Sequence, residues 1–149
     1  MLAWRTCKTR YDPYDGSGAA HWGGRWNSPG HPVLYTADSF AGSILEIIAH
    51  ALRPRTLPGP HHAVRVEIPD DMIEWLEGDR LDGWDARDAA EARAFGDRWL
   101  RESRSAALAV PSLPARPVGR LLLLNLAHGD ARRLERGAPF AVPWDEQLF

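Results

Sequence analysis

A strand followed by a helix is predicted at residues 32–52, whose sequence is PVLYTADSFAGSILEIIAHAL. The apolar run at 33–36 indicates a buried strand, and residues 39–52 repeat apolar side chains at helical spacing. The helix is expected to end before Pro54, because proline disrupts a helix interior. The apolar side chains cover one arc of this helix, which is its expected core face, and Glu46 lies on the opposite, polar side.

Further strands and one more helix extend this unit in both directions. Alternating patterns or short apolar runs predict strands at 2–6, 64–68, 73–76, 105–110, 120–126 and within 139–149. A second helix is predicted at 86–103, and Asp130 is expected to cap a short helix that ends at Leu134. Residues 12–30 are rich in turn-forming residues and are interpreted as a loop. These elements predict an α+β (mixed α/β) fold, a single domain over residues 1–149 around a central sheet.

The composition excludes several classes of protein. The 149 residues carry a formal net charge of −2 with a pI of about 6.3, whereas a general DNA-coating protein needs a basic excess. Cys7 is the only cysteine, which rules out an intramolecular disulfide and a Cys-x-x-Cys metal site. The longest apolar run, 121–124, is far shorter than the roughly 20 residues of a membrane-spanning helix. We therefore expect a cytoplasmic protein with no bound metal and no membrane contact.

Charge is distributed unevenly along the chain. Between Glu67 and Glu91, ten acidic residues stand against two arginines, which gives this stretch a net charge of −8. The stretch is interpreted as a solvated surface, with docking of a basic partner as the alternative. Of the 18 basic residues all but Lys8 are arginines. Arginine grips phosphate or carboxylate with two hydrogen bonds, but a genome rich in G and C also favours arginine codons, so both explanations stay open.

The densest group of candidate site residues is Gly23-Gly24-Arg25-Trp26-Asn27, which Tyr35 and Glu46 follow. Paired glycines let the backbone approach a ligand, Arg25 can hold an anion, and Trp26 or Tyr35 can offer a flat face to a ring. The structural alternative is a tight turn with a buried tryptophan and an ion-paired arginine.

Glu46 also has two interpretations. In the first, Ser43 and Glu46 form a capping box, a role that lapses if the helix begins near Ser39. In the second, Glu46 stabilises the positive charge of an oxocarbenium-like transition state. We find no second carboxylate to act as an acid, so the leaving group would have to depart without a proton. Ser112 and Asn125, each at a strand end, either contact a ligand or satisfy loop backbone groups.

Together these motifs resemble the RES-domain family, the toxins of bacterial toxin–antitoxin pairs. The resemblance runs from residue 4 to about residue 130 and rests on Trp4-Arg5, Gly23–Asn27, Pro32–Thr36, Leu45-Glu46, Val110–Ser112 and Leu124-Asn125. The family is named for an Arg, a Glu and a Ser, which correspond here to Arg25, Glu46 and Ser112. Many members have proline after the Asn, where this chain has Leu126.

The resemblance implies a fold similar to ADP-ribosyltransferases and cleavage of the nicotinamide–ribose bond of NAD⁺, with NAD⁺ as the substrate and no separate cofactor. Glu46, Arg25 and Tyr35 would be catalytic, and the substrate would be bound by Arg5, Gly24, Trp26, Asn27, Ser112 and Asn125. Nicotinamide leaves as a neutral molecule and needs no general acid, which agrees with the single carboxylate.

The resemblance also implies partners. An Xre-type antitoxin would cover the active site and supply any contact with DNA, and a homodimer within that complex is compatible with the resemblance. Two other functions stay open, namely transfer of ADP-ribose to a host protein and a non-catalytic module that binds a nucleotide or a protein.

Overall fold

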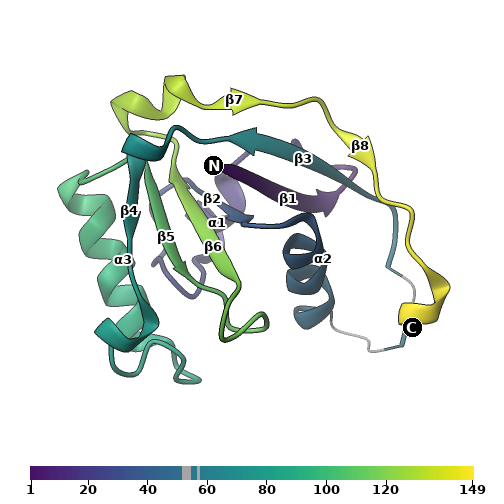
Figure 1. Cartoon of the computed structure of the whole chain (residues 1–149), viewed down its shortest axis with the longest axis horizontal. Helices are drawn as coiled ribbons and strands as arrows, with labels where there is room; N and C mark the ends of the chain where they lie inside the picture. Colours follow the sequence, from purple (N-terminus) through teal and green to yellow (C-terminus); the bar gives the residue numbers. More distant parts are fainter. Residues whose placement is uncertain (52–54, 57) are drawn as a thin grey trace.

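A curled sheet of eight strands forms the centre of the molecule (Figure 1). The computed structural model describes residues 1–51, 55–56 and 58–149. Seven strands follow the order β4-β5-β6-β2-β1-β3-β7, and β8 pairs with β3. All pairs are antiparallel except β4–β5. The strands are β1 (Leu2–Lys8), β2 (Val33–Ala37), β3 (His61–Glu67), β4 (Ile73–Trp75), β5 (Ala107–Pro111), β6 (Arg120–Asn125), β7 (Glu135–Arg136) and β8 (Phe140–Ala141).

The sequence pattern located most of these strands. Each predicted strand is present, and the mixed α/β fold around one sheet is confirmed. The largest shift is at β3, which begins at His61 where the pattern predicted Val64. The two-residue strand β7 was not predicted, because two residues are too few to show an alternation.

Within the described residues, three helices accompany the sheet: α1 (Ser17–Trp22), α2 (Phe40–Ala49) and α3 (Ala90–Glu102). Short 3₁₀ turns lie at Asp70–Met72, Gly78–Arg80, Gly129–Arg133 and Glu146–Leu148. Across the described parts of the chain, every helix is too short or too polar to span a bilayer.

Three predictions about helices need correction. The interpretation of residues 12–30 as a loop is wrong at α1. The second helix begins at Ala90 and not at Ala86, because Ala89 has a left-handed backbone with φ of 55°. The 3₁₀ turn near residue 130 is capped by His128, whose side chain accepts a hydrogen bond from the backbone N of Asp130 at 3.0 Å.

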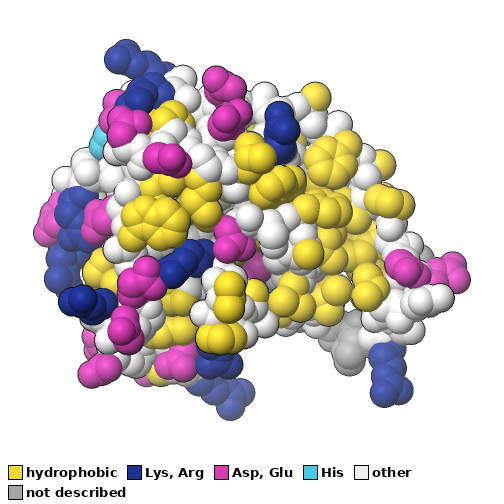
Figure 2. All heavy atoms as spheres, in the orientation of Figure 1, with side chains coloured by type: hydrophobic (Ala, Val, Ile, Leu, Met, Phe, Trp, Pro, Cys, Tyr) yellow, Lys and Arg dark blue, Asp and Glu magenta, His cyan; other side chains and the backbone are white. Residues whose placement is uncertain are grey.

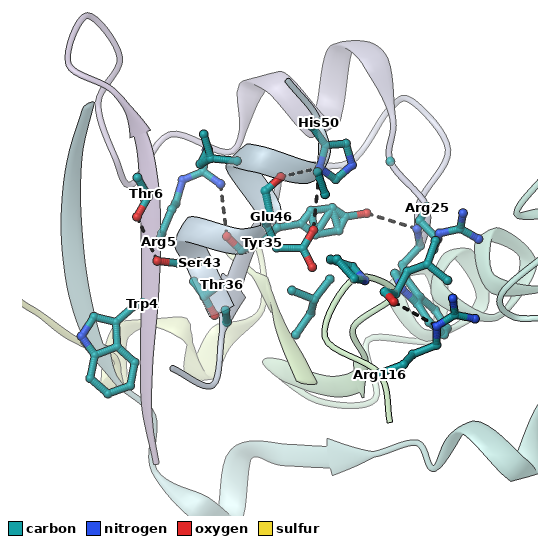
Figure 3. Close-up of a pocket in the computed structure, with 18 of the residues that line it drawn as sticks. Trp4, Arg5, Thr6, Arg25, Tyr35, Thr36, Ser43, Glu46, His50 and Arg116 are labelled. Carbon is teal, nitrogen blue, oxygen red and sulfur yellow. Dashed lines mark hydrogen bonds and ion pairs between the residues drawn. The ribbon is translucent and has the colours of Figure 1, made fainter. Parts of the chain in front are cut away.

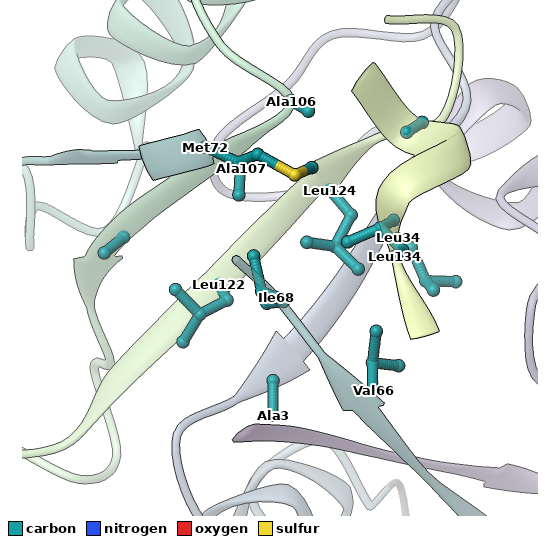
Figure 4. Packing of buried hydrophobic residues seen from close by; sticks show 12 residues of the cluster. Ala3, Leu34, Val66, Ile68, Met72, Ala106, Ala107, Leu122, Leu124 and Leu134 are labelled. Carbon is teal, nitrogen blue, oxygen red and sulfur yellow. The ribbon is translucent and has the colours of Figure 1, made fainter. Parts of the chain in front are cut away.

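Side chains of the central strands enter two apolar clusters. On β6, Leu122 and Leu124 belong to the cluster drawn in Figure 4, and Leu123 belongs to a second cluster that contains Trp26 and Trp99. Successive side chains of a strand point to opposite faces of a sheet, so the consecutive leucines of β6 are buried on both sides. Helix α3 provides Trp99 and therefore covers the face that holds the second cluster.

Helix α2 packs on β1 with Ser43 as its buried residue, whereas the isoleucines of the expected apolar arc are half-buried and belong to neither apolar cluster, so this arc is not the core face that the sequence predicted. Ser43 is buried, donates to the carbonyl O of Phe40 at 2.8 Å, and shares a 2.9 Å hydrogen bond with the hydroxyl of Thr6 on β1. On the outer side, Leu45 is 36% exposed. Figure 2 shows hydrophobic side chains gathered over α2 and β8, where Phe140 is also exposed.

The start of α2 decides between the two interpretations of Glu46. Ser39 is the N-cap residue, and its Oγ accepts a hydrogen bond from the backbone N of Gly42 at 2.9 Å. Glu46 therefore lies in the second turn, and a capping box with Ser43 is excluded. The helix ends at Ala49, and Leu52, its predicted last residue, lies outside the described residues.

Half of the acidic residues between Glu67 and Glu91 form ion pairs with distant parts of the chain. The pairs are Asp70 with the N-terminus (3.1 Å), Asp71–Arg133 (2.9 Å), Glu74–Arg104 (2.9 Å), Glu77–Arg120 (2.6 Å) and Asp85–Arg116 (3.1 Å). Figure 2 shows the resulting mixture of acidic and basic side chains on this face. Each exposed pair adds little stability because water screens it, but the pairs leave less uncompensated negative charge than the sequence suggested.

Two separate glycine-to-alanine substitutions test the packing of α3 on the loop before β2. A Cβ on Gly96 would lie 1.6 Å from the carbonyl O of Trp26, whereas a Cβ on Gly18 in α1 would meet nothing within 4 Å. We expect Gly96→Ala to lower the free energy of unfolding by about 2–3 kcal/mol. Gly18→Ala should leave it unchanged or raise it by up to about 1 kcal/mol, because alanine favours a helix. Urea denaturation measures both, and equal effects would contradict the close backbone contact.

Candidate functional site

A cavity of about 660 Å³ opens between α2, β1, β2 and the loops at 23–26 and 113–116. Figure 3 shows Glu46 in its middle, with Arg5 on one side and Arg25 on the other. Such a volume is typical of pockets for ligands of nucleotide size.

Ser112 fixes the carboxylate of Glu46. The buried hydroxyl of Ser112 donates to Oε1 of Glu46 at 2.7 Å and accepts a hydrogen bond from the backbone N of Ala115 at 3.3 Å. The side chain of Glu46 is 20% exposed, so the carboxylate stays in contact with the cavity. One oxygen is thus held in place, and Oε2 is available to a ligand.

His50 stands next to Glu46 one helical turn later. Its Nδ1 lies 2.7 Å from the carbonyl O of Glu46 and 3.8 Å from Oε2. Because a carbonyl oxygen can only accept, Nδ1 carries the proton in this arrangement. His50 therefore holds its Nδ1–H group against the carbonyl O of Glu46, near the free carboxylate oxygen.

Tyr35 is tied to the loop that precedes β2. Its hydroxyl donates to Oδ1 of Asn27 and accepts a hydrogen bond from the backbone N of Trp26 at 3.3 Å. A Cβ on Gly24 would lie 2.5 Å from the same hydroxyl oxygen, so residue 24 must be glycine for the tyrosine to fit. Burial raises the pKa of Tyr35 well above the ordinary value for tyrosine, which keeps the hydroxyl protonated.

Two arginines flank Glu46 in different environments. Arg5 on β1 is mostly buried, and burial lowers its pKa from the ordinary arginine value. Its Nη1 donates to the carbonyl O of Tyr35 at 3.2 Å, while Nε is buried without a partner in the described part of the chain. Arg25 instead donates from Nη1 to two carbonyl oxygens, those of Trp84 at 3.1 Å and Ala86 at 2.9 Å.

Comparison with known proteins shows the family of the chain and a similar fold. The sequence profile described as "RES domain" matches residues 2–145. The chain belongs to the RES domain family. The fold also resembles the M. tuberculosis MbcT–MbcA toxin–antitoxin complex, with a TM-score of 0.77 and 21% identity over 95% of this chain and 83% of that chain.

Two proteins with similar sequences are named as toxins. A protein from Sphingobium sp. (strain YBL2), named Prs ADP-ribosylating toxin, is 37% identical over 129 residues, which are 83% of this chain and 79% of that protein. A protein named Toxin Res from Pseudomonas putida is 32% identical over the full length of both chains.

The RES domain brings most of the predicted site residues to the cavity. Lining residues include Arg5, Gly24, Arg25, Tyr35 and Glu46. Ser112 is not among the lining residues and hydrogen-bonds to Glu46, whereas the sequence suggested direct contact with the substrate.

Three predicted substrate contacts also have structural partners in this RES domain. Trp26 is among the lining residues of the cavity, but its indole is buried and stacks on Trp84 at 6.2 Å. Asn27 is buried and holds Tyr35. Asn125 lies outside the cavity lining, where its Oδ1 accepts a hydrogen bond from the backbone N of Ala127 at 3.1 Å.

Sequence reasoning missed five polar residues that line the cavity: Thr6, Thr36, Ser43, His50 and Arg116. A signal for His50 was present, because it lies four residues after Glu46 and shares its helical face. Arg116 had no such signal, because its place beside Arg25 depends on the tertiary fold.

Removal of one hydroxyl tests the connection between Tyr35 and the loop. We expect Tyr35→Phe to lower the free energy of unfolding by about 1–3 kcal/mol, because Asn27 and the backbone N of Trp26 lose a buried partner. The control is Tyr11→Phe, since Tyr11 is 51% exposed; it should change stability by less than about 0.5 kcal/mol. Equal effects of the two substitutions in urea denaturation would count against this connection.

The loss of stability in Tyr35→Phe is also expected to depend on pH. The raised pKa of Tyr35 means that the unfolded chain releases this proton near about pH 10, while the folded chain retains it. The tyrosine therefore contributes stability that is complete below about pH 10 and is lost as the pH rises further. We expect the stability difference between wild type and Tyr35→Phe to shrink between about pH 9 and 11. A difference independent of pH in urea denaturation would refute this assignment.

Proposed function

We propose that this RES domain is the toxin of a toxin–antitoxin pair and that it depletes NAD⁺ by cleaving the nicotinamide–ribose bond. The observation that supports this most strongly is the carboxylate of Glu46, held through one oxygen by Ser112 and open to the cavity through the other. The names of the relatives as toxins support the cellular role.

The proposed step needs one carboxylate and no acid. The bond between C1′ and the nicotinamide nitrogen breaks, and its electron pair leaves with nicotinamide, which becomes neutral. Positive charge develops on the ribose, and the ionised carboxylate of Glu46 stabilises it. An acceptor then bonds to C1′ and releases its proton to the solvent.

The lining of the cavity suits two parts of NAD⁺, the nicotinamide ring and the diphosphate. Tyr35 offers a ring surface against which nicotinamide can pack, and its hydroxyl is already used by the loop. Arg25 supplies donors and positive charge for the diphosphate. NAD⁺ is thus consumed as a substrate, and we assign no separate cofactor.

The acceptor decides between two outcomes of the same cleavage. Water or phosphate would give free ADP-ribose or its phosphate, and a protein side chain would give an ADP-ribosylated protein. The name of the Sphingobium relative favours the second outcome as an alternative for this chain.

An antitoxin is the expected protein partner. The structural neighbour comes from a toxin–antitoxin complex. We propose an Xre-type antitoxin that covers the cavity, that makes any DNA contact on behalf of the pair, and that can hold two copies of this chain together.

The test is NAD⁺ loss by the purified protein, followed by mass spectrometry of NAD⁺, nicotinamide and ADP-ribose. We expect Glu46→Gln to slow the loss on the order of 100-fold or more, because the neutral amide cannot stabilise the developing charge. Glu135→Gln is the matched control, since Glu135 is exposed on β7 and lies outside the cavity lining.

Each outcome has a defined meaning. Loss of NAD⁺ at the wild-type rate in Glu46→Gln would show that the carboxylate assignment is wrong. Full retention of NAD⁺ by the wild-type protein would favour the non-catalytic binding module. A mass increase of one ADP-ribose unit on a protein of a cell extract would favour transfer over hydrolysis.

A further inference from the structure

Two arginines from distant parts of the chain reach the same edge of the cavity. Arg25 follows Gly24, and Arg116 lies in the loop between β5 and β6. Both side chains bind the segment at 84–86: Arg25 through carbonyl oxygens, and Arg116 through Nη1 to Oδ2 of Asp85 at 3.1 Å. Figure 3 shows both guanidinium groups on the side of the cavity opposite Arg5.

The bonds that hold these arginines leave donors free for a ligand. Arg25 uses only Nη1, and within the described residues its Nε and Nη2 donate to no protein acceptor. Arg116 uses Nε toward the carbonyl O of Leu113 at 3.0 Å and Nη1 toward Asp85, which leaves Nη2 unused by the described residues. Two guanidinium groups with free N–H groups at one edge match an anion that has several oxygens.

Charge also favours a diphosphate at this edge. Arg25 and Arg116 carry two positive charges against the one negative charge of Asp85. The ion pair between Arg116 and Asp85 is about half exposed, with side-chain exposures of 51% and 47%, so it adds little to stability and is easily exchanged. The cationic nicotinamide ring of NAD⁺ would be repelled at this edge, whereas its diphosphate carries two negative charges.

From these contacts we infer that Arg116 and Arg25 form a clamp for the diphosphate of the substrate. On binding, the diphosphate replaces Asp85 as the ion-pair partner of Arg116. This inference rests on the proposed function and fixes the direction of the substrate in the cavity. The diphosphate lies at the Arg25–Arg116 edge and the ribose lies at Glu46, so the nicotinamide ring lies on the side of Glu46 away from these two arginines. Arg116 is thus a substrate-binding residue that determines preference for a dinucleotide.

Binding of ADP-ribose tests the clamp without any turnover. Isothermal titration of ADP-ribose into the full chain should show affinity about tenfold weaker for Arg116→Gln than for wild type, as expected for loss of one charged hydrogen-bonding group. Asp85→Asn should strengthen binding, because it removes the competing carboxylate. The control is Arg133→Gln, which also breaks an exposed ion pair, that with Asp71, but lies outside the cavity lining.

Cleavage of three substrates adds a second readout. Nicotinamide riboside lacks phosphate, nicotinamide mononucleotide has one, and NAD⁺ has the diphosphate. For Arg116→Gln we expect KM to rise about tenfold for NAD⁺ with kcat nearly unchanged, to rise less for the mononucleotide, and to stay at the wild-type value for the riboside.

The outcomes separate this inference from the proposed function. Unchanged ADP-ribose affinity in Arg116→Gln, or an equal loss with NAD⁺ and the riboside, overturns the clamp while leaving cleavage at Glu46 intact. Weaker binding in Asp85→Asn overturns the exchange of partners. Weakened ADP-ribose binding in Arg116→Gln together with normal NAD⁺ loss in Glu46→Gln supports the clamp and rejects the catalytic role of Glu46.

Discussion

The hydroxyl of Tyr35 is the point on which both the packing and the site depend. It holds the backbone of Trp26 and the side chain of Asn27, and so it fixes the loop before β2 onto the sheet. That loop sends Trp26 into the apolar cluster under α3 and Arg25 to the edge of the cavity. Gly96 lets α3 approach the same loop backbone. A change in the packing of α3 would therefore be transmitted to Arg25.

Most of the sheet could be predicted from the sequence, because alternation and apolar runs report burial directly. The helices were harder, for two physical reasons. Helix α1 has six residues, and neither its N-cap residue Gly16 nor any buried residue marks it. The side of α2 that packs on the sheet carries Ser43, which hydrogen-bonds to Thr6, 37 positions away in the sequence. The apolar pattern of the helix alone therefore did not predict which side packs inward.

Most charged residues of the site could be predicted from the sequence. Glu46 and Arg25 were singled out because they lie in the motifs that resemble the RES-domain family, and both line the cavity. Trp26, Asn27 and Ser112 were identified as site residues, but the pattern could not distinguish contact with a ligand from support of a neighbour. The excess of arginine divides in a similar way. Arg104, Arg120 and Arg133 pair with the acidic stretch, Arg5 and Arg25 line the cavity, and Arg116 does both.

The orientation of α2 follows from the placement of the carboxylate. A helix that turned its apolar arc toward the sheet would gain hydrophobic stabilisation, but it would carry Glu46 into the solvent. In this chain Ser43 meets Thr6 on the inward side, and Leu45 stays partly exposed on the outer side. The same orientation aims Glu46 at Ser112 and into the cavity. The helix thus leaves Leu45 exposed and its isoleucines half-buried, and it holds a carboxylate at the centre of the cavity.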